Sequence, residues 1–139
     1  MATRSMIGFE EFDGTVTGIY CHWDGYVENN GKILVENYNT IEDVEALLEL
    51  GNLSMLGSEL GEKHDFNGDV ENWCKAYGRD RGDLKTEAVT YANRDAFADS
   101  DSWCEYFYLF DGNEWFYCTL SDVNWKSVQK ELDLRTESV

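Results

Sequence analysis

The sequence contains no proline, and only 11 Lys and Arg residues stand against 28 Asp and Glu residues. The absence of proline excludes rigid proline-rich linkers and favours one continuous domain. The shortage of basic residues gives a formal net charge of −17. Such a charge opposes direct binding to nucleic acid, because phosphate contacts need Lys and Arg. We therefore expect a single acidic domain over residues 1–139 that does not bind DNA or RNA directly.

Long apolar runs are also missing. No stretch approaches the roughly 20 apolar residues of a membrane span, and the opening MATRSMIGFEEF lacks the apolar segment of a signal peptide. No C-x-x-C pair of the kind that holds structural zinc is formed by the cysteines, which are Cys21, Cys74, Cys104 and Cys118. These absences predict a cytoplasmic protein with reduced thiols, no metal, no cofactor and no membrane partner.

Apolar residues make up 42% of the chain and aromatic residues 14%, which is enough for a core. Two β-hairpins are predicted. Asp13-Gly14 separates MIGFEEF from TVTGIYCHW, and Asp111-Gly112-Asn113 separates WCEYFYLF from EWFYCTL. Asp-Gly between apolar runs favours a tight turn, because both turn positions take positive φ. The strands of the second hairpin are apolar on both faces, so we expect them in the centre of the sheet or beneath helices.

Four helices are predicted. The spacing of Ile33, Leu34 and Tyr38 indicates a helix over 32–38. A second helix begins after Thr40 in a capping-box-like sequence and ends at Gly51; its apolar stripe is Ile41, Val44, Leu47 and Leu48. Asp69 is a candidate cap for a short helix through Trp73 and Tyr77. Ser121 or Asp122 begins a last helix whose inward residues are Trp125, Val128 and Leu132. The predicted fold is α+β, with an antiparallel sheet of about four strands built from the two hairpins and helices packed on one face.

The second predicted helix carries Glu42, Glu45 and Glu49 on the side opposite its apolar stripe. Their rises of about 4.5 and 6 Å are compatible with the phosphate spacing of a nucleic-acid strand, roughly 3.4 Å. No Lys or Arg occurs between Ile33 and Glu62. The predicted partner-binding surface comprises the carboxylates of Glu36, Glu42, Asp43, Glu45, Glu49, Glu59 and Glu62. The alternative is a solvated face that only keeps the protein soluble.

The densest group of functional side chains is Tyr20-Cys-His-Trp-Asp-Gly-Tyr26. On a strand, His22 and Asp24 would point to the same side, an arrangement able to orient an imidazole for acid–base catalysis. No known catalytic motif accompanies this pair, so no catalytic residue is assigned. Three alternatives are a packed structural segment, an unrecognised enzyme, and a pocket for a nucleotide signal. The predicted pocket residues are Arg4, His22, Trp23, Asp24, Tyr26 and Glu28.

Thr3-Arg4-Ser5, the Asp13-Gly14 turn and the His22-Trp-Asp-Gly-Tyr26 loop, followed by Glu28, Gly31, Leu34 and Tyr38, resemble a family of small phage and prophage proteins. The resemblance covers roughly residues 1–40, and Ala2 departs from the Gly-Thr-Arg-Ser opening frequent in that family. It implies a viral or mobile-element origin and action inside a host cell. Together with the acidity, it predicts an anti-CRISPR or anti-restriction protein that occupies the basic, nucleic-acid-binding surface of a host defence protein.

Overall fold

Two β-hairpins form the middle of the structure, at the positions that the turn residues predict. The computed structural model describes residues 2–68 and 70–137. In it, β1 (Ser5–Glu10) pairs antiparallel with β2 (Val16–Cys21), and Gly14 between them has a φ of 89°. Strands β6 (Tyr106–Phe110) and β7 (Trp115–Thr119) form the second hairpin. Both predicted hairpins are confirmed.

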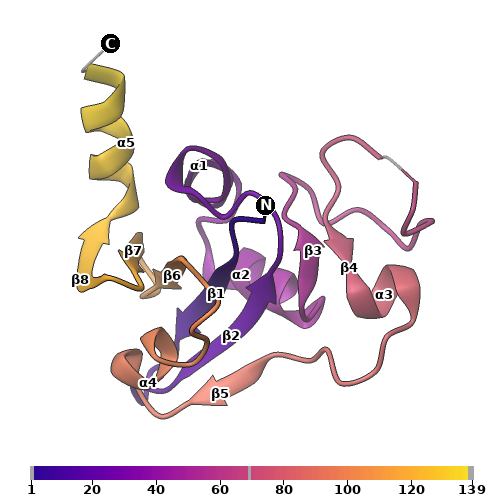
Figure 1. Ribbon diagram of the computed structural model, residues 1–139, viewed down its shortest axis with the longest axis horizontal. Helices are drawn as coiled ribbons and strands as arrows, with labels where there is room; N and C mark the ends of the chain where they lie inside the picture. The colour runs from indigo at the N-terminus through magenta and orange to yellow at the C-terminus, as the bar shows by residue number, and fades with distance from the viewer. Residues whose placement is uncertain (1, 69, 138–139) are drawn as a thin grey trace.

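The sheet as a whole differs from the prediction of about four antiparallel strands, which is wrong. The described residues form a mixed sheet of eight strands in the order β4-β3-β2-β1-β6-β7-β8, with β5 also pairing with β2 (Figure 1). β1 runs parallel to β6, and β2 runs parallel to β3. The remaining strands are β3 (Leu53–Met55), β4 (Lys75–Ala76), β5 (Val89–Tyr91) and β8 (Asp122–Ser127). Three of these four have only two or three residues, too few to show an alternating pattern in sequence.

The first two predicted helices are confirmed as α1 (Lys32–Asn37) and α2 (Ile41–Glu49). A π-helical turn over Val27–Gly31 precedes α1. The hydroxyl of Thr40 accepts the backbone N–H of Asp43 at 3.1 Å, as a helix cap does. Gly51 follows the helix with a φ of 75°, a conformation that favours glycine.

The predicted last helix begins too early. Residues 122–127 form β8 against β7, and α5 (Val128–Glu137) starts only at Val128. Trp125 lies in β8 and packs against the buried residues that include Phe97 and Phe107. The apolar residues that suggested one helix are therefore divided between β8, which contains Trp125, and α5, which contains Val128 and Leu132. Asp69, the candidate cap, lies outside the described residues. The prediction of a short helix through Trp73 is wrong, because residues 70–76 are not helical and α3 (Tyr77–Arg81) begins only after β4.

Helices cover both faces of the sheet, so the prediction of helices on one face is also wrong. Buried residues of α1, α2 and α5 pack with one set of sheet residues, which includes Ile7, Ile19 and Tyr108. On the opposite face, α4 (Arg94–Ala98) packs through Phe97 against Met6, Phe107 and Leu109. The sequence leaves residues 86–102 open between a helix and an irregular strand, because a five-residue helix is too short for a periodic pattern.

A pair of glycines makes room for α4. Gly8 and Gly18 stand opposite each other in the β1–β2 register. A Cβ atom built on Gly18 would lie 2.6 Å from Cε1 of Phe97, and one built on Gly8 would lie 2.8 Å from its Cζ. The aromatic ring therefore occupies the space that side chains at these two positions would fill.

The four cysteines are buried and none is joined in a disulfide, which agrees with the expectation of free thiols. Burial raises the pKa of Cys21 and that of Cys118 to about 12, so their reactive thiolate forms are scarce near neutral pH. Within the described residues, no helix has both the length and the apolar character needed to cross a membrane.

We expect Gly18→Ala to lower the free energy of unfolding by about 1–3 kcal/mol, because Phe97 must leave its position. Urea denaturation followed by circular dichroism measures this change. In the background of Phe97→Ala the same substitution should cost much less, since the ring is then absent. Equal costs in the two backgrounds would show that Phe97 does not impose the glycine.

Candidate functional site

The acidic side of α2 faces away from the protein. Val44, Leu47 and Leu48 are buried against the sheet, and this places Glu42, Glu45 and Glu49 on the exposed side. The position of the apolar stripe thus fixes where the carboxylates point.

Two of these glutamates line a groove with carboxylates from distant segments. Glu45 and Glu49 meet Glu11, which follows β1, and Glu87, which precedes β5, around a cavity of about 260 Å³. Its other lining residues are Phe9, Thr17, Leu48 and Ala88. Among the ion pairs of the described residues, none includes any of the four glutamates. We call this feature the acidic groove.

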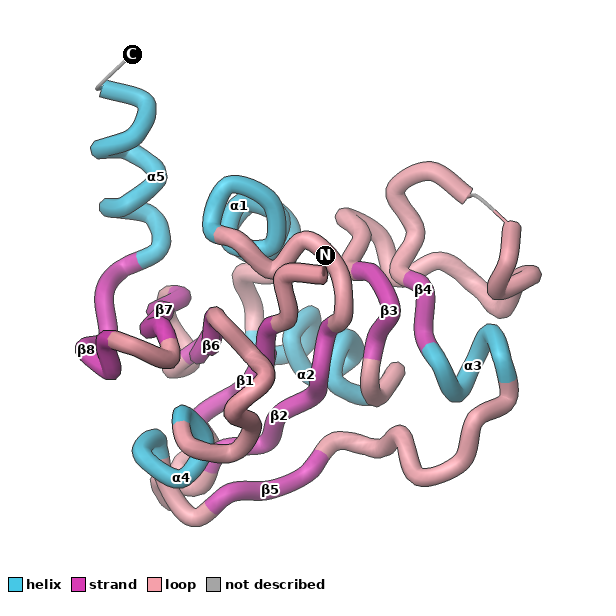
Figure 2. Tube along the Cα trace, in the orientation of Figure 1, coloured by secondary structure: helices cyan, strands magenta, loops and turns pink. Residues whose placement is uncertain are grey.

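The connection from α3 to β5 brings Glu87 to the groove. It runs along the outside of the sheet (Figure 2), and the backbone N–H of Asn52 donates to the carbonyl oxygen of Thr86 at 2.7 Å. A Cβ atom on Gly51 would lie 2.3 Å from the same oxygen, so glycine is needed for this close approach. Sequence reasoning missed both residues because tertiary contacts bring them beside α2: Glu11 through the packing of α2 on β1, and Glu87 through the pairing of β5 with β2.

The other predicted carboxylates lie at separate places. Asp43 is exposed on the first turn of α2. Glu36 lines a different cavity, of about 630 Å³, between α1 and α5. Glu59 and Glu62 are exposed in the long segment between β3 and β4. The seven predicted residues are therefore all exposed, but they do not converge on one groove.

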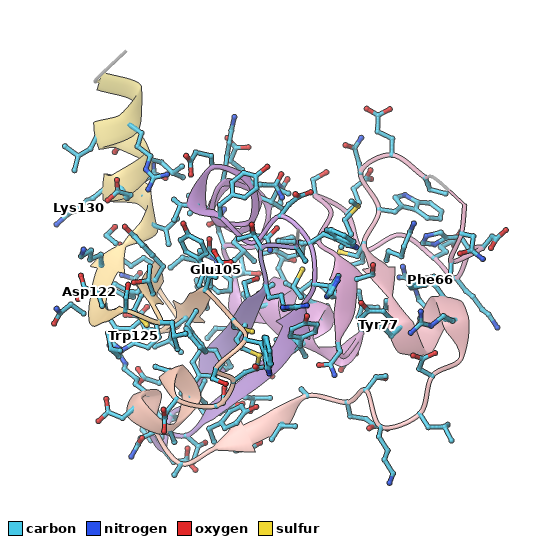
Figure 3. The ribbon with its side chains drawn as sticks, in the orientation of Figure 1. Phe66, Tyr77, Glu105, Asp122, Trp125 and Lys130 are labelled. Atoms are coloured by element: carbon cyan, nitrogen blue, oxygen red, sulfur yellow. The ribbon has the colours of Figure 1, made fainter. Side chains whose placement is uncertain are left out.

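The segment between β3 and β4 is held by a ring cluster. The rings of Phe66 and Tyr77 stack with their centroids 5.6 Å apart (Figure 3). The Arg81 guanidinium lies 4.6 Å from the Phe66 centroid and 4.7 Å from that of Tyr77, and it also pairs with Asp83 at 2.7 Å. These contacts fix the far end of the segment against α3.

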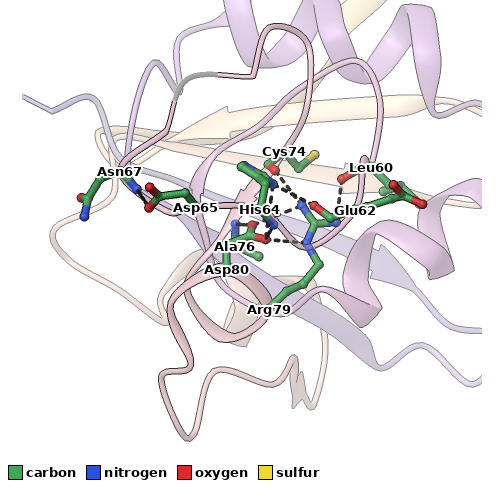
Figure 4. Close-up of polar contacts among 9 residues, drawn as sticks. All are labelled: Leu60, Glu62, His64, Asp65, Asn67, Cys74, Ala76, Arg79 and Asp80. Carbon is green, nitrogen blue, oxygen red and sulfur yellow. Dashed lines mark hydrogen bonds and ion pairs between the residues drawn. The ribbon is translucent and has the colours of Figure 1, made fainter.

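A buried ion pair holds the same segment at its base (Figure 4). The Asp80 side chain, fully buried, accepts N–H groups from Ala76 at 2.8 Å and His64 at 3.2 Å, and pairs with Arg79 at 2.9 Å. Arg79 also donates to the carbonyl oxygens of Leu60 and Cys74 at 2.7 and 2.8 Å. Burial acts to raise the pKa of Asp80, but the bonds from Arg79 and the two amides outweigh it and lower that pKa. The position of Glu59 and Glu62 thus depends on this pair.

A second group of side chains surrounds Arg4. A cavity of about 510 Å³ is lined by Arg4, Tyr20, Asn52, Asp101 and Trp103. The Arg4 guanidinium lies 5.8 Å from the centroid of the Trp103 ring, and Trp103 is 75% exposed. We call these five residues the Arg4 cluster.

His22 and Trp23 extend the Arg4 cluster. The Tyr20 hydroxyl lies 2.7 Å from Nδ1 of His22, and the His22 ring meets the Trp23 ring edge-on at 4.8 Å. Burial and the charge of Arg4 both lower the pKa of His22, which favours a neutral imidazole at pH 7. Burial raises the pKa of Tyr20 to about 12.

The structure brings together only part of the predicted pocket. Arg4, His22 and Trp23 are neighbours, whereas Glu28 pairs with Arg135 beside the α1–α5 cavity. Asp24 occupies a turn with a φ of 55°.

Tyr26 is 39% exposed at the start of the π-helical turn. The hydrogen-bonding partner of His22 is Tyr20 rather than Asp24, so the proposed acid–base pair does not form. Trp23 is 42% exposed and is therefore not the packed residue of the structural alternative. Asn52 and Trp103 were missed because separate loops carry them to the site.

Comparison with known proteins gives no relative: no family model, no curated protein and no solved structure matches this chain. Among the residues that the structure describes, no group of three or more His, Cys, Asp and Glu side chains is placed to hold a metal ion. The acidic groove and the Arg4 cluster are thus the two candidate sites, and their own chemistry must indicate what they bind.

We expect Asp80→Ala to lower the free energy of unfolding by about 3–5 kcal/mol, because it leaves Arg79 buried without its partner. Asp83→Ala is the matched control: it breaks the pair with Arg81, whose side chains are 49% and 34% exposed, and should cost less than about 1 kcal/mol. Chemical denaturation at pH 7 measures both. Similar costs for the two variants would contradict a structural role for the buried pair.

The pH dependence gives a further measurement on Asp80→Ala. Because the pKa of Asp80 is lowered in the folded protein, its carboxylate stabilises the fold above the unfolded value, about 3.9. This stabilisation is lost as pH falls through the lowered pKa. The difference between the wild-type protein and the variant should therefore shrink below about pH 4.

Proposed function

We propose that the protein is a binding protein that acts in the cytoplasm of a host cell and occupies the basic, nucleic-acid-binding surface of a host defence protein. The resemblance of residues 1–40 to phage proteins suggests an anti-CRISPR or anti-restriction role. The acidic groove is the observation that supports the proposal best.

The acidic groove combines carboxylates with apolar side chains. Its rim carries Glu11, Glu45, Glu49 and Glu87, and Phe9, Leu48 and Ala88 contribute apolar lining. A Lys or Arg side chain has the same two parts, an apolar stem and a charged head. Its stem would pack on the apolar residues while its head forms charge-assisted hydrogen bonds to the carboxylates. A face that only promotes solubility has no need of this combination.

The placement of the glutamates has an energetic cost that a cationic partner would remove. Glu45 and Glu49 stand four residues apart on α2, and like charges at this spacing destabilise a helix by a few tenths of a kcal/mol. Glu11 and Glu87 add two more negative charges around the same cavity. The net charge of −17 also accelerates encounter with a basic surface over the screening length of about 8 Å at physiological salt.

A second candidate function is the binding of a nucleotide at the Arg4 cluster. The supporting observation is an indole ring, 75% exposed, with a guanidinium beside it. A base can stack on the open face of Trp103, and Arg4 can pair with a phosphate. The negative charge of the rest of the domain opposes a phosphate ligand, which is why we place this function second.

The main proposal predicts that reversing Glu42, Glu45 and Glu49 to Lys abolishes inhibition of the host nucleic-acid enzyme while the fold remains intact. The three residues are exposed, so the circular dichroism spectrum and midpoint of denaturation should change little. The matched control reverses three exposed acids outside α2, Asp99, Glu105 and Asp133, with the same change in net charge. The control should keep most of the inhibition, and wild-type inhibition should weaken between 0.1 and 1 M salt. Inhibition retained by a folded α2 variant would exclude this surface.

The second candidate predicts loss of nucleotide affinity in Arg4→Ala and in Trp103→Ala, measured by titration calorimetry against a panel of mononucleotides and cyclic nucleotides. Tryptophan fluorescence should be quenched on binding to the wild-type protein. The triple α2 variant should bind with unchanged affinity. The absence of heat and of quenching across the panel at millimolar concentration would reject this function.

A further inference from the structure

Strand β8 ends the sheet with an unpaired edge. It pairs antiparallel with β7 on one side, and no strand among residues 2–68 and 70–137 pairs with its other side (Figure 1). With six residues, Asp122–Ser127, it is as long as β1 and β2 in the centre of the sheet. An exposed strand edge presents backbone N–H and C=O groups that are ready to pair with a further strand.

The side chains of β8 form two different rows. Asp122 contacts both Asn124 and Lys126: Asn124 Nδ2 donates to Asp122 Oδ1 at 2.6 Å, and Lys126 Nζ lies 3.2 Å from Asp122 Oδ2. Trp125 belongs to the other row and stacks on Phe97 with centroids 6.5 Å apart. Val123, in the same row as Trp125, is 49% exposed.

The charged and apolar side chains of β8 are complementary to those of a second β8 that runs antiparallel to it. If a second β8 pairs antiparallel with Asn124 opposite its own copy, Asp122 stands opposite Lys126 of the second copy, and Lys126 opposite Asp122. Val123 then stands opposite Trp125 in both halves. Opposite charges and apolar pairs directly across a ladder each stabilise it, by roughly 0.2–1 kcal/mol. Centring the pairing on Val123 or on Trp125 loses both charge pairs.

We propose that the protein forms a two-fold symmetric dimer in which β8 pairs antiparallel with β8 of a second copy, with Asn124 at the axis. The two sheets become one continuous sheet. This inference goes beyond the proposed function and does not depend on it.

Two features of β8 would normally discourage edge pairing. Lysine on an edge strand repels most partners, and the β7–β8 ladder is bulged, because the three residues 123–125 of β8 stand opposite the single residue Cys118 of β7. Asp122, Asn124 and Lys126 nonetheless share one side of β8, as their side-chain contacts show. In the proposed register, Lys126 meets a carboxylate, so its charge opposes unrelated strands but not a second copy. The lysine thus gives the edge specificity, since it penalises every partner that has no acid at the matching position.

The dimer leaves the acidic groove open. α2 packs over β1 and β2 in the middle of the sheet order, and β6 and β7 separate these strands from β8. The two acidic grooves would therefore lie away from the dimer interface. Because each copy carries a charge of −17, repulsion between copies should make the dimer tighter at higher salt. This is the opposite of the salt dependence expected for the inhibitory complex, so the two proposals can fail separately.

Sedimentation equilibrium of the full chain, at several protein and salt concentrations, tests the proposal. Asp122→Lys and Lys126→Asp each place like charges opposite one another twice per dimer, and each should weaken dimerisation by about tenfold or more. The double variant restores both charge pairs in reverse and should dimerise as the wild-type protein does. Asp133→Lys and Lys130→Asp, on exposed positions of α5, make the same changes in net charge and should have little effect.

Asn124→Cys provides a measurement that is independent of charge. The two introduced thiols should form an intermolecular disulfide under mild oxidation, because the axis brings identical positions together, while the four native cysteines are buried. A covalent dimer on a non-reducing gel supports the proposal. A monomer at all concentrations, a dimer insensitive to the single reversals, a double variant that does not recover, or an absence of cross-linking would each overturn it.

Discussion

Strand β6 buries side chains on both of its faces, and the arrangement of the other strands and helices follows from the need to cover both faces. Phe107, Tyr108, Leu109 and Phe110 are each 0% exposed. A strand of this kind needs a neighbour on each edge and a cover on each face. β1 and β7 supply the edges, while α1, α2 and α5 cover one face and α4 the other. The Tyr108 hydroxyl also donates to the carbonyl oxygen of Gly25 at 2.5 Å, which ties the loop after β2 to the same strand.

The acidity of the protein is compatible with this core because most carboxylates lie outside it. α2 separates the two kinds of side chain along its length, with Val44, Leu47 and Leu48 inside and glutamates outside. Among the residues whose burial the structure describes, Asp80 is the one buried carboxylate, and it has Arg79 and two backbone amides as partners. A net charge far from zero destabilises a compact state through self-repulsion. The four glutamates of the acidic groove repel one another, and a bound cation would remove this part of the repulsion.

Local patterns predicted the elements that depend on neighbouring residues. The Asp-Gly turns, the Thr40 cap and the apolar stripe of α2 each act within a few residues, and the structure has them where expected. The extent of the sheet could not be predicted in this way, because β1 pairs with β6 through residues such as Ser5 and Tyr106.

The candidate sites likewise combine residues placed by their neighbours in sequence with residues placed by tertiary contacts. His22 and Trp23 follow β2 directly and contact Tyr20 and each other, so their proximity could be predicted from their places in the sequence. Arg4 precedes β1, the strand that pairs with β2, and its charge acts on His22. Glu28 was misplaced because the π-helical turn over Val27–Gly31 directs it towards Arg135. Glu87 and Trp103 reach their sites on loops whose paths are set by tertiary contacts, which no local pattern encodes.

The parallel pairing of β1 with β6 determines when the protein can fold during its synthesis. β1 and β2 emerge first from the ribosome, but the strand that completes their sheet begins at Tyr106. Because synthesis adds about 5–20 residues per second, the β1 edge of the first hairpin stays unpaired for roughly 5–20 s until β6 is made. Such long-range contacts slow folding, because loop closure is unfavourable until they form. A nascent or truncated chain that ends before β6 therefore exposes an apolar strand edge, and chaperones or proteases of the producing cell are its natural first contacts.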